Sequence, residues 1–243
     1  MGVSESSARL WHSLGLGPLW RERAVLAAPG TVRESPPPTS QLDWEGLERA
    51  VSTCAACGLC QSRTQTVFGT GSRSASWMFV GEAPGAEEDA RGEPFVGQAG
   101  RLLDNMLAAV GLGRDRSGEQ AVFIANVLKC RPPGNRNPDA AEVAACVPYL
   151  RRQIELLQPR LIVVMGRFAA QAIVASDASI ANLRGRVHRV AVGTDSYPVI
   201  VTYHPAYLLR NLADKSKVWD DLCLARQTYS RLTKDSAARP GGG

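Results

Sequence analysis

The chain has 243 residues, of which 44% are hydrophobic and 21% are charged, and its formal net charge is +5. This length suits one domain with a sizeable core plus terminal extensions, and the basic balance permits a polyanionic partner without demanding one. No run approaches the ~20 apolar residues of a membrane span, and the N-terminus has no secretory signal pattern. We therefore expect a cytoplasmic protein, in which six cysteines indicate metal or cluster ligation, or buried thiols.

The two ends of the chain differ in composition from its middle. Residues 1–40 include a Ser-Pro-Pro-Pro-Thr-Ser run at 35–40, which favours an extended linker, and residues 234–243 end in Pro-Gly-Gly-Gly. We predict a disordered N-terminal extension at 1–40, one folded domain at 41–233 and a flexible tail at 234–243.

Hydrophobic periodicity predicts strands and helices that alternate through the middle of the chain. The predicted helices cover residues 44–54, 99–110, about 139–157, 168–174 and about 217–232. The predicted strands cover residues 77–80, 122–128, 161–165, 187–192 and 199–203. Asp139 and Glu142 form a capping-box pattern at the start of the third helix, and Pro159 stops that helix. This alternation indicates an α/β fold, in which helices cover both faces of a largely parallel sheet.

Three unusual turns follow predicted strands in this chain, after Val80, after Val127 and after Tyr203. Ligands of parallel sheets bind at the carboxyl ends of the strands. The convergence of the three turns at one edge of the sheet is therefore the first indication of a functional site.

The first turn has the sequence Gly-Glu-Ala-Pro-Gly at 81–85, and a Pro-Phe-Val-Gly loop follows it at 94–97. Glu82 lies directly at the strand end, where a carboxylate can accept protons or orient water, and we favour a functional role for it. Phe95 lies in a loop rich in glycine and proline, from which an aromatic ring can stack on a planar base. We interpret Glu87 and Glu88 as a solvated acidic run.

The other two turns each carry a conspicuous polar residue. Asn126 interrupts an apolar strand, and two interpretations stay open for it, because its amide can bond a neighbouring loop or read the edge of a base. His204 stands at a strand end before a proline, which favours a site role over the structural role that is commoner for a lone histidine. In Leu208-Leu209-Arg210, apolar side chains can wedge between bases while the arginine holds phosphate. The alternative is the first turn of a helix with two core leucines.

Five of the cysteines form a pattern: Cys54, Cys57 and Cys60 lie three residues apart, Cys130 follows a predicted strand, and Cys146 lies in the next helix. Two cysteines with two residues between them suit one metal or cluster. The distant cysteines are single, so a second close pair, as in a zinc ribbon, is missing. The pattern therefore favours an iron–sulfur cluster that pins three segments together.

Together these motifs resemble those of the family-4 uracil-DNA glycosylases, which carry a [4Fe-4S] cluster. The resemblance covers about residues 50–230, and it implies a three-layer α/β/α sandwich with a central, mainly parallel four-stranded sheet. The matching stretches are Cys-Ala-Ala-Cys-Gly-Leu at 54–59, Val-Gly-Glu-Ala-Pro-Gly at 80–85, Pro-Phe-Val-Gly at 94–97, Asn-Val-Leu-Lys-Cys-Arg-Pro-Pro at 126–133, Cys146, and His-Pro-Ala-Tyr-Leu-Leu-Arg at 204–210.

The resemblance implies a DNA-repair enzyme that hydrolyses the N-glycosidic bond of deoxyuridine in DNA, releases uracil and leaves an abasic site. It implies two catalytic residues, with Glu82 orienting water and His204 facing the 2-carbonyl oxygen of uracil. Phe95 would stack on the flipped base, and Asn126 would hydrogen-bond its edge. The implied uracil-binding residues are Gly81, Glu82, Ala83, Phe95, Asn126 and His204.

The resemblance also implies the cofactor and the partners. A structural [4Fe-4S] cluster would be held by Cys54, Cys57, Cys130 and Cys146, which leaves Cys60 spare. We expect a monomer that acts on single- or double-stranded DNA in the cytoplasm, associated with the nucleoid. The residues expected to contact DNA are Leu208, Leu209, Arg210, Lys129 and Arg136.

One position departs from the wider superfamily, whose best-known members have an aspartate where this chain has Ala83. The alanine fits family 4 and leaves Glu82 as the expected carboxylate. Three other hypotheses stay open: a glycosylase for a different damaged base, a non-catalytic iron–sulfur DNA-binding protein, and a zinc protein with four cysteine ligands.

Overall fold

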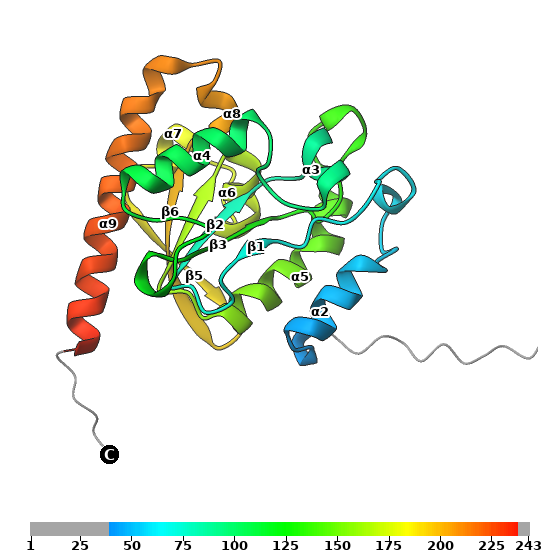
Figure 1. Ribbon diagram of the computed structural model, residues 1–243, viewed down its shortest axis with the longest axis horizontal. Coiled ribbons are helices and arrows are strands. Elements are labelled where there is room, and N and C mark those ends of the chain that lie inside the picture. The colour runs from blue at the N-terminus through cyan, green and yellow to red at the C-terminus, as the bar shows by residue number, and fades with distance from the viewer. Residues whose placement is uncertain (1–38, 238–243) are drawn as a thin grey trace, which may run out of the picture. The chain divides into compact units, whose positions relative to one another are not determined.

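The structure is a computed structural model that describes residues 39–237, so nearly all of the predicted extension at 1–40 and most of the predicted tail lie outside the described residues. Six strands form one sheet in the order β1-β3-β2-β4-β6-β5 (Figure 1). Their bounds are β1 Thr70–Gly71, β2 Trp77–Gly81, β3 Val122–Asn126, β4 Leu161–Met165, β5 Val187–Val192 and β6 Asp195–Thr202.

The four central strands, β3, β2, β4 and β6, are parallel to one another, whereas β1 and β5 pair antiparallel at the two edges. The predicted α/β sandwich with a mainly parallel sheet is thus confirmed, but the sheet has six strands instead of the four that the resemblance implied. Of the two antiparallel edge strands, β5 was predicted as a strand at 187–192 and β1 was not. β1 has only two residues, and no hydrophobic pattern of that length distinguishes a strand from a loop.

Helices flank the sheet on both faces. The α-helices are α2 Trp44–Ser52, α3 Ala86–Arg91, α4 Gln98–Ala109, α5 Ala140–Leu157, α6 Arg167–Val174, α7 Ile180–Leu183, α8 Pro205–Leu208 and α9 Lys215–Ala237. Short 3₁₀ helices are η1 Thr39–Gln41, η2 Gly58–Gln61, η3 Gly118–Gln120, η4 Pro133–Asn135 and η5 Leu212–Asp214. Among the described residues, none of the helices combines the length and apolar character needed to cross a membrane.

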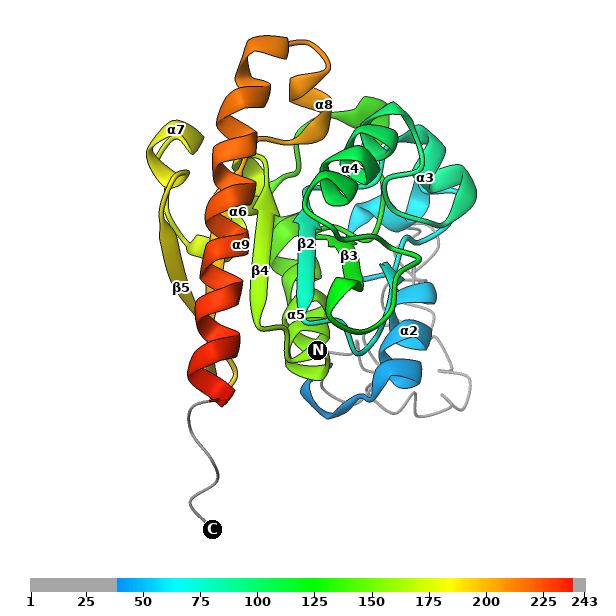
Figure 2. The ribbon, with the colours of Figure 1, turned by 60° about the vertical axis from the view of Figure 1, so that its left-hand side comes forward.

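The central strands are apolar on both faces because each face is covered. Along β2, Met78 and Val80 pack with α2, α5 and α6, while Trp77 and Phe79 pack with α4 and α9. Side chains alternate between the two faces of a strand, so this pattern places helices on both sides of the sheet. Figure 2 shows α4 and α9 on one side of β2 and β4, with α5 on the other.

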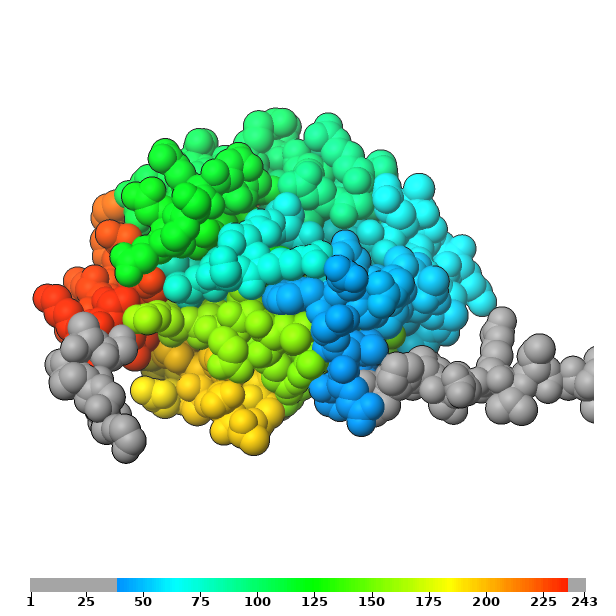
Figure 3. All heavy atoms as spheres, turned by 60° about the horizontal axis from the view of Figure 1, so that its bottom comes forward, coloured from blue at the N-terminus to red at the C-terminus, as the bar shows by residue number. Residues whose placement is uncertain are grey.

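Two helix ends follow the local chemistry of the chain. The predicted cap of α5 is present, because the Asp139 backbone N–H donates to the Glu142 carboxylate at 2.9 Å. Helix α2 lies beside α5 on the surface shown in Figure 3, and the Arg152 guanidinium on α5 donates to the carbonyl of Leu42 at 2.7 Å. Helix α2 ends at Ser52 and strand β3 ends at Asn126, each two residues earlier than predicted, so residues 53–54 and 127–128 lie in loops.

Candidate active site

The carboxyl ends of all four parallel strands open onto one pocket with a volume of about 700 Å³. This volume lies within the range of small-molecule sites. At the end of β4 the pocket is lined by Gly166 and by Arg167, the first residue of α6, in addition to the three strand ends singled out in the sequence. Of the six predicted uracil-binding residues, the pocket is lined by Glu82, Ala83, Phe95, Asn126 and His204.

Glu82 is the first residue after β2, and its backbone carbonyl accepts a hydrogen bond from Leu128 N–H at 3.0 Å. Burial raises the pKa of the Glu82 carboxyl above its ordinary value, and the positive charge of Arg167 acts in the opposite direction. A carboxylate in this position can orient a water molecule and stabilise a nearby positive charge.

Asn126 ends β3 with only 2% of its surface exposed, and its side-chain oxygen Oδ1 has no hydrogen-bond partner among the described residues. A buried polar atom without a partner is costly, so this oxygen suits a ligand that brings a donor. Gly81, paired with Asn126 across the two strands, permits the arrangement. A Cβ atom at Gly81 would lie 2.4 Å from Asn126 Oδ1 and 2.6 Å from Cζ of Phe95.

His204 follows β6, and its ring is oriented by its own chain. The Ala206 backbone N–H donates to His204 Nδ1 at 3.1 Å. Because Nδ1 accepts, the proton of the neutral ring is on Nε2, which is left to act as a donor. Burial lowers the pKa of His204 to about 4, the negative charge of Glu88 partly offsetting this effect, so the ring is neutral at physiological pH. The ring stacks on Phe95 with 5.4 Å between centroids.

The loop that carries Phe95 is held by Glu88, which the sequence suggested was part of a solvated acidic run. The Glu88 carboxylate instead accepts hydrogen bonds from three backbone N–H groups, those of Gly85 at 3.1 Å, Val96 at 3.0 Å and Gly97 at 3.2 Å. Glu88 therefore ties the first turn of the site to the Phe95 loop. Its position in α3 could have been inferred only if that short helix had been recognised.

Two of the residues expected to meet DNA line the mouth of the pocket, Arg136 and Arg210. The Arg136 guanidinium also contacts the Glu142 carboxylate, with Nη1 and Oε2 at 3.0 Å. The two adjacent leucines differ in burial. Leu208 is 1% exposed and packs in the core, whereas Leu209 is 40% exposed. The alternative of a helical turn with core leucines thus describes Leu208, whereas Leu209 is exposed at the surface.

The structure corrects the expectation for Lys129, whose side chain is 1% exposed and out of reach of DNA. Its ammonium group donates to the Asn126 carbonyl at 2.8 Å and to Gln153 Oε1 at 2.6 Å. A lysine in a loop is normally exposed, and nothing local in the sequence distinguishes this one. Lys129 is a buried connector between the end of β3 and α5.

Several other residues that line the pocket were not predicted from the sequence. Arg167 follows the apolar strand 161–165, and the Gly166-Arg167 pair after a buried strand was a signal comparable to the other three turns. Tyr203 and Tyr207 line the same pocket, and their rings stack on each other with 4.9 Å between centroids. In the sequence they precede and follow His204.

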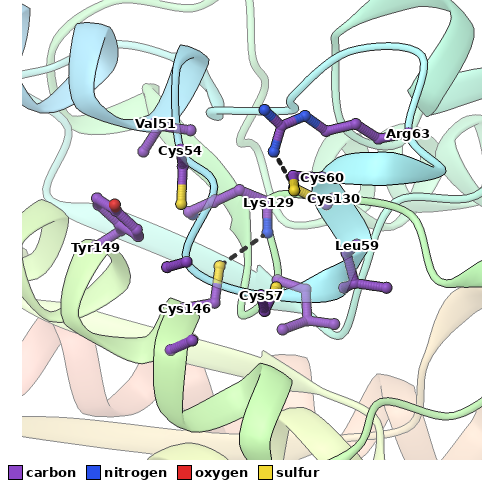
Figure 4. A pocket seen from close by; sticks show the side chains of 13 residues that line it. Val51, Cys54, Cys57, Leu59, Cys60, Arg63, Lys129, Cys130, Cys146 and Tyr149 are labelled. Atoms are coloured by element: carbon purple, nitrogen blue, oxygen red, sulfur yellow. Dashed lines mark hydrogen bonds between the residues drawn. The ribbon is translucent and has the colours of Figure 1, made fainter. Parts of the chain in front are cut away.

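Cysteine side chains from four segments line a second pocket, shown in Figure 4. They come from the loop after α2, from η2 and the residue before it, from the loop after β3, and from α5: Cys54, Cys57, Cys60, Cys130 and Cys146. Two sulfur atoms accept hydrogen bonds, Cys130 Sγ from Arg63 Nη1 at 3.1 Å and Cys146 Sγ from the Lys129 backbone N–H at 3.2 Å. The predicted ligands thus converge, and Cys60 lies with them.

Within residues 39–237, no group of three His, Cys, Asp or Glu side chains is arranged as a metal site. The chemistry of the donors nevertheless fits an iron–sulfur cluster. Cysteine thiolates bind such clusters, and N–H donors to sulfur stabilise them. The pocket supplies thiols and two such donors.

Comparisons with known proteins agree on one family. Residues 68–223 match the model of the uracil DNA glycosylase superfamily. A type-4 uracil-DNA glycosylase of Archaeoglobus fulgidus is 45% identical over 68% of this chain and 82% of its own length. The type-4 enzyme of Thermotoga maritima is 42% identical over 70% of this chain and 85% of its own length. That of Sulfurisphaera tokodaii is 44% identical over 69% and 76%. The chain therefore belongs to the type-4 uracil-DNA glycosylases.

Proposed function

We propose that the protein hydrolyses the N-glycosidic bond of deoxyuridine in DNA, releasing uracil and leaving an abasic site for repair. The relatives named above are uracil-DNA glycosylases. The observation that carries the proposal is the unpartnered Oδ1 of Asn126 in the pocket that also receives His204. Uracil offers a donor at N3 flanked by acceptors at O2 and O4. The Asn126 amide and the Nε2–H of His204 complement that edge.

Base capture comes first in the proposed mechanism. The target nucleotide must leave the helix, at a cost of a few kcal/mol. Leu209 fills the vacated space, while Arg210 and Arg136 hold phosphates near the mouth of the pocket. Phe95 then stacks on the base and Asn126 binds its edge. Leu208 supports this tip from the core.

Bond cleavage follows from the charges that the pocket can stabilise. The bond between C1′ and N1 breaks with its electron pair on the base, whose O2 receives a hydrogen bond from neutral His204. Such a preorganised donor is worth roughly 3–4 kcal/mol of transition-state stabilisation. Ionised Glu82 orients the water that attacks C1′ and balances the positive charge of the sugar. The attacking water gives up its proton to the Glu82 carboxylate as the new C–O bond forms, and the uracil anion takes up a proton to leave as neutral uracil.

We further propose that Cys54, Cys57, Cys130 and Cys146 hold a [4Fe-4S] cluster. The cluster supplies a structural cross-link, because glycosidic hydrolysis involves no electron transfer. The cysteine segments and the end of β3 are thereby fixed relative to one another. We propose that the enzyme acts as a monomer in the cytoplasm, associated with the nucleoid.

A labelled oligonucleotide with one uracil tests the function. We expect alkali-sensitive cleavage by the wild type. The Glu82→Gln variant should excise at least ~100-fold more slowly in single turnovers, without weaker DNA binding. The control is Glu119→Gln, a change at an exposed glutamate of η3. Cleavage of hypoxanthine- or etheno-base oligonucleotides alone would favour a different glycosylase. DNA binding without any cleavage would favour a non-catalytic protein.

A further inference from the structure

Phe95 has a backbone conformation that phenylalanine seldom adopts. Its φ is +57°, in the left-handed region, and the residue is 5% exposed. A residue with a side chain persists there only when its surroundings hold it. The surroundings of this one residue therefore decide whether the ring is in place for stacking.

Arg114 holds the carbonyl side of this loop. Its guanidinium donates from Nη1 to the Pro94 carbonyl at 3.2 Å and from Nη2 to the Phe95 carbonyl at 3.1 Å. The opposite side is held by Glu88, which accepts from the N–H groups that follow Phe95. The backbone around Phe95 is thus fixed from both directions by charged side chains, whose hydrogen bonds are stronger than neutral ones.

Arg114 is itself oriented and shielded. Its side chain is 14% exposed, with Nε at 2.9 Å from Asp104 Oδ1 on α4 and Nη1 at 3.4 Å from Glu93 Oε1. α4 also approaches the loop closely, since a Cβ atom at Gly100 would lie 1.8 Å from the Phe95 carbonyl oxygen. The planar guanidinium has several donors and so bridges α4 and the Phe95 loop. The ammonium group of a lysine is a single point charge and would not hold both partners in the same geometry.

We propose that Arg114 is a positioning residue for base capture: it acts through Phe95, by keeping the aromatic ring where a flipped pyrimidine stacks. This rests on the proposed uracil excision. Arg114 lies outside the pocket and outside every motif that pointed to the site.

Single-turnover excision by Arg114→Met tests the proposal, with Arg116→Met as the matched control. Arg116 is an exposed arginine two positions further along the same loop. We expect Arg114→Met to slow excision ~10- to 100-fold, since small misplacements of binding groups have effects of this size. DNA binding by Arg114→Met and the rate of Arg116→Met should match the wild type. Equal rates for Arg114→Met and the wild type would overturn the proposal.

A double-mutant cycle with Phe95→Ala separates positioning from general destabilisation. If Arg114 acts through Phe95, adding Arg114→Met to Phe95→Ala should slow excision no further. An equal fold-loss in both backgrounds would show that Arg114 acts elsewhere, and would overturn the proposal. Should Arg114→Met not fold, Arg114→Lys takes its place in the cycle, because it keeps the charge and loses the fork. A wild type that excises no uracil would overturn the proposed function together with this inference.

Discussion

Burial shifts the pKa values of Glu82 and His204 in opposite directions, and each shift favours the neutral form of its group. Burial raises the pKa of Glu82, and it lowers that of His204 to about 4. As the pH falls, the Glu82 carboxylate is therefore lost at a higher pH than an ordinary glutamate, whereas His204 stays neutral until about pH 4. The acid limb of the pH–rate profile should accordingly report Glu82.

Replacing Arg167 tests this assignment. Arg167 lowers the pKa of Glu82, so Arg167→Gln should let that pKa rise and should move the acid limb to higher pH. Single-turnover excision rates between about pH 4.5 and 8 measure the limb. Arg151→Gln, at an exposed position of α5, is the control and should leave the limb in place. An unmoved limb in Arg167→Gln would mean that another group governs it.

At the scale of elements, Lys129 connects the end of β3 to α5 and to the cysteine pocket. Its ammonium group bonds Asn126 O and Gln153 Oε1, and its backbone N–H bonds Cys146 Sγ. Gln153 in turn donates to the Phe68 carbonyl at 2.9 Å. The strand end that presents Asn126 is thus fixed by a buried chain of hydrogen bonds.

Removing the ammonium group should destabilise the protein. In Lys129→Met, the Asn126 carbonyl and the Gln153 amide oxygen lose a buried donor, and we expect a free energy of unfolding lower by about 1–3 kcal/mol. Urea unfolding at matched cofactor content would show this as a lower midpoint with an unchanged slope. Lys234→Met, at an exposed lysine of α9, should shift the midpoint little. An unchanged midpoint for Lys129→Met would show that the buried lysine contributes no net stability.

The positions of the main site residues were predictable because the end of an apolar strand can be recognised in the sequence. Strands of five buried residues, such as β2, β3 and β4, are visible in the sequence, and so are the polar residues that follow them. Glu82, Asn126 and His204 were therefore found without knowing how the strands pair. Arg114 and Glu88 were not, because their role consists of contacts between loops, which hydrophobic periodicity does not encode.

The burial of individual side chains could not be predicted from the sequence. Lys129 was expected at the surface because the cost of burying an ammonium group is met only by partners distant in the chain, such as Gln153. Leu208 and Leu209 are adjacent and chemically alike, yet only the packing of α8 decides which of them is buried. Tertiary contacts decide such questions, and local composition does not.

At the scale of the whole molecule, the cysteine pocket joins segments that are distant in sequence. Cys54 and Cys57 belong to the segment between α2 and η2, Cys130 follows β3, and Cys146 is on α5. A cluster bound there would close long loops. Losing it should therefore loosen both the segment between α2 and η2 and the end of β3 beside Asn126. We therefore expect its removal to lower both thermal stability and excision.

Single cysteine-to-serine variants test which thiols hold the cluster. The resemblance to family 4 makes Cys60 spare, although Cys60 lines the same pocket as the four proposed ligands. Cys146→Ser should lose the broad visible absorbance of a [4Fe-4S] protein and melt at a lower temperature, because one corner of the cross-link is gone. Cys60→Ser should keep both the colour and the melting temperature, as should Cys223→Ser in α9. A colourless Cys60→Ser together with a brown Cys57→Ser would show that Cys60 is the ligand and Cys57 the spare thiol. Colour in every single variant would show that any four of the five thiols suffice.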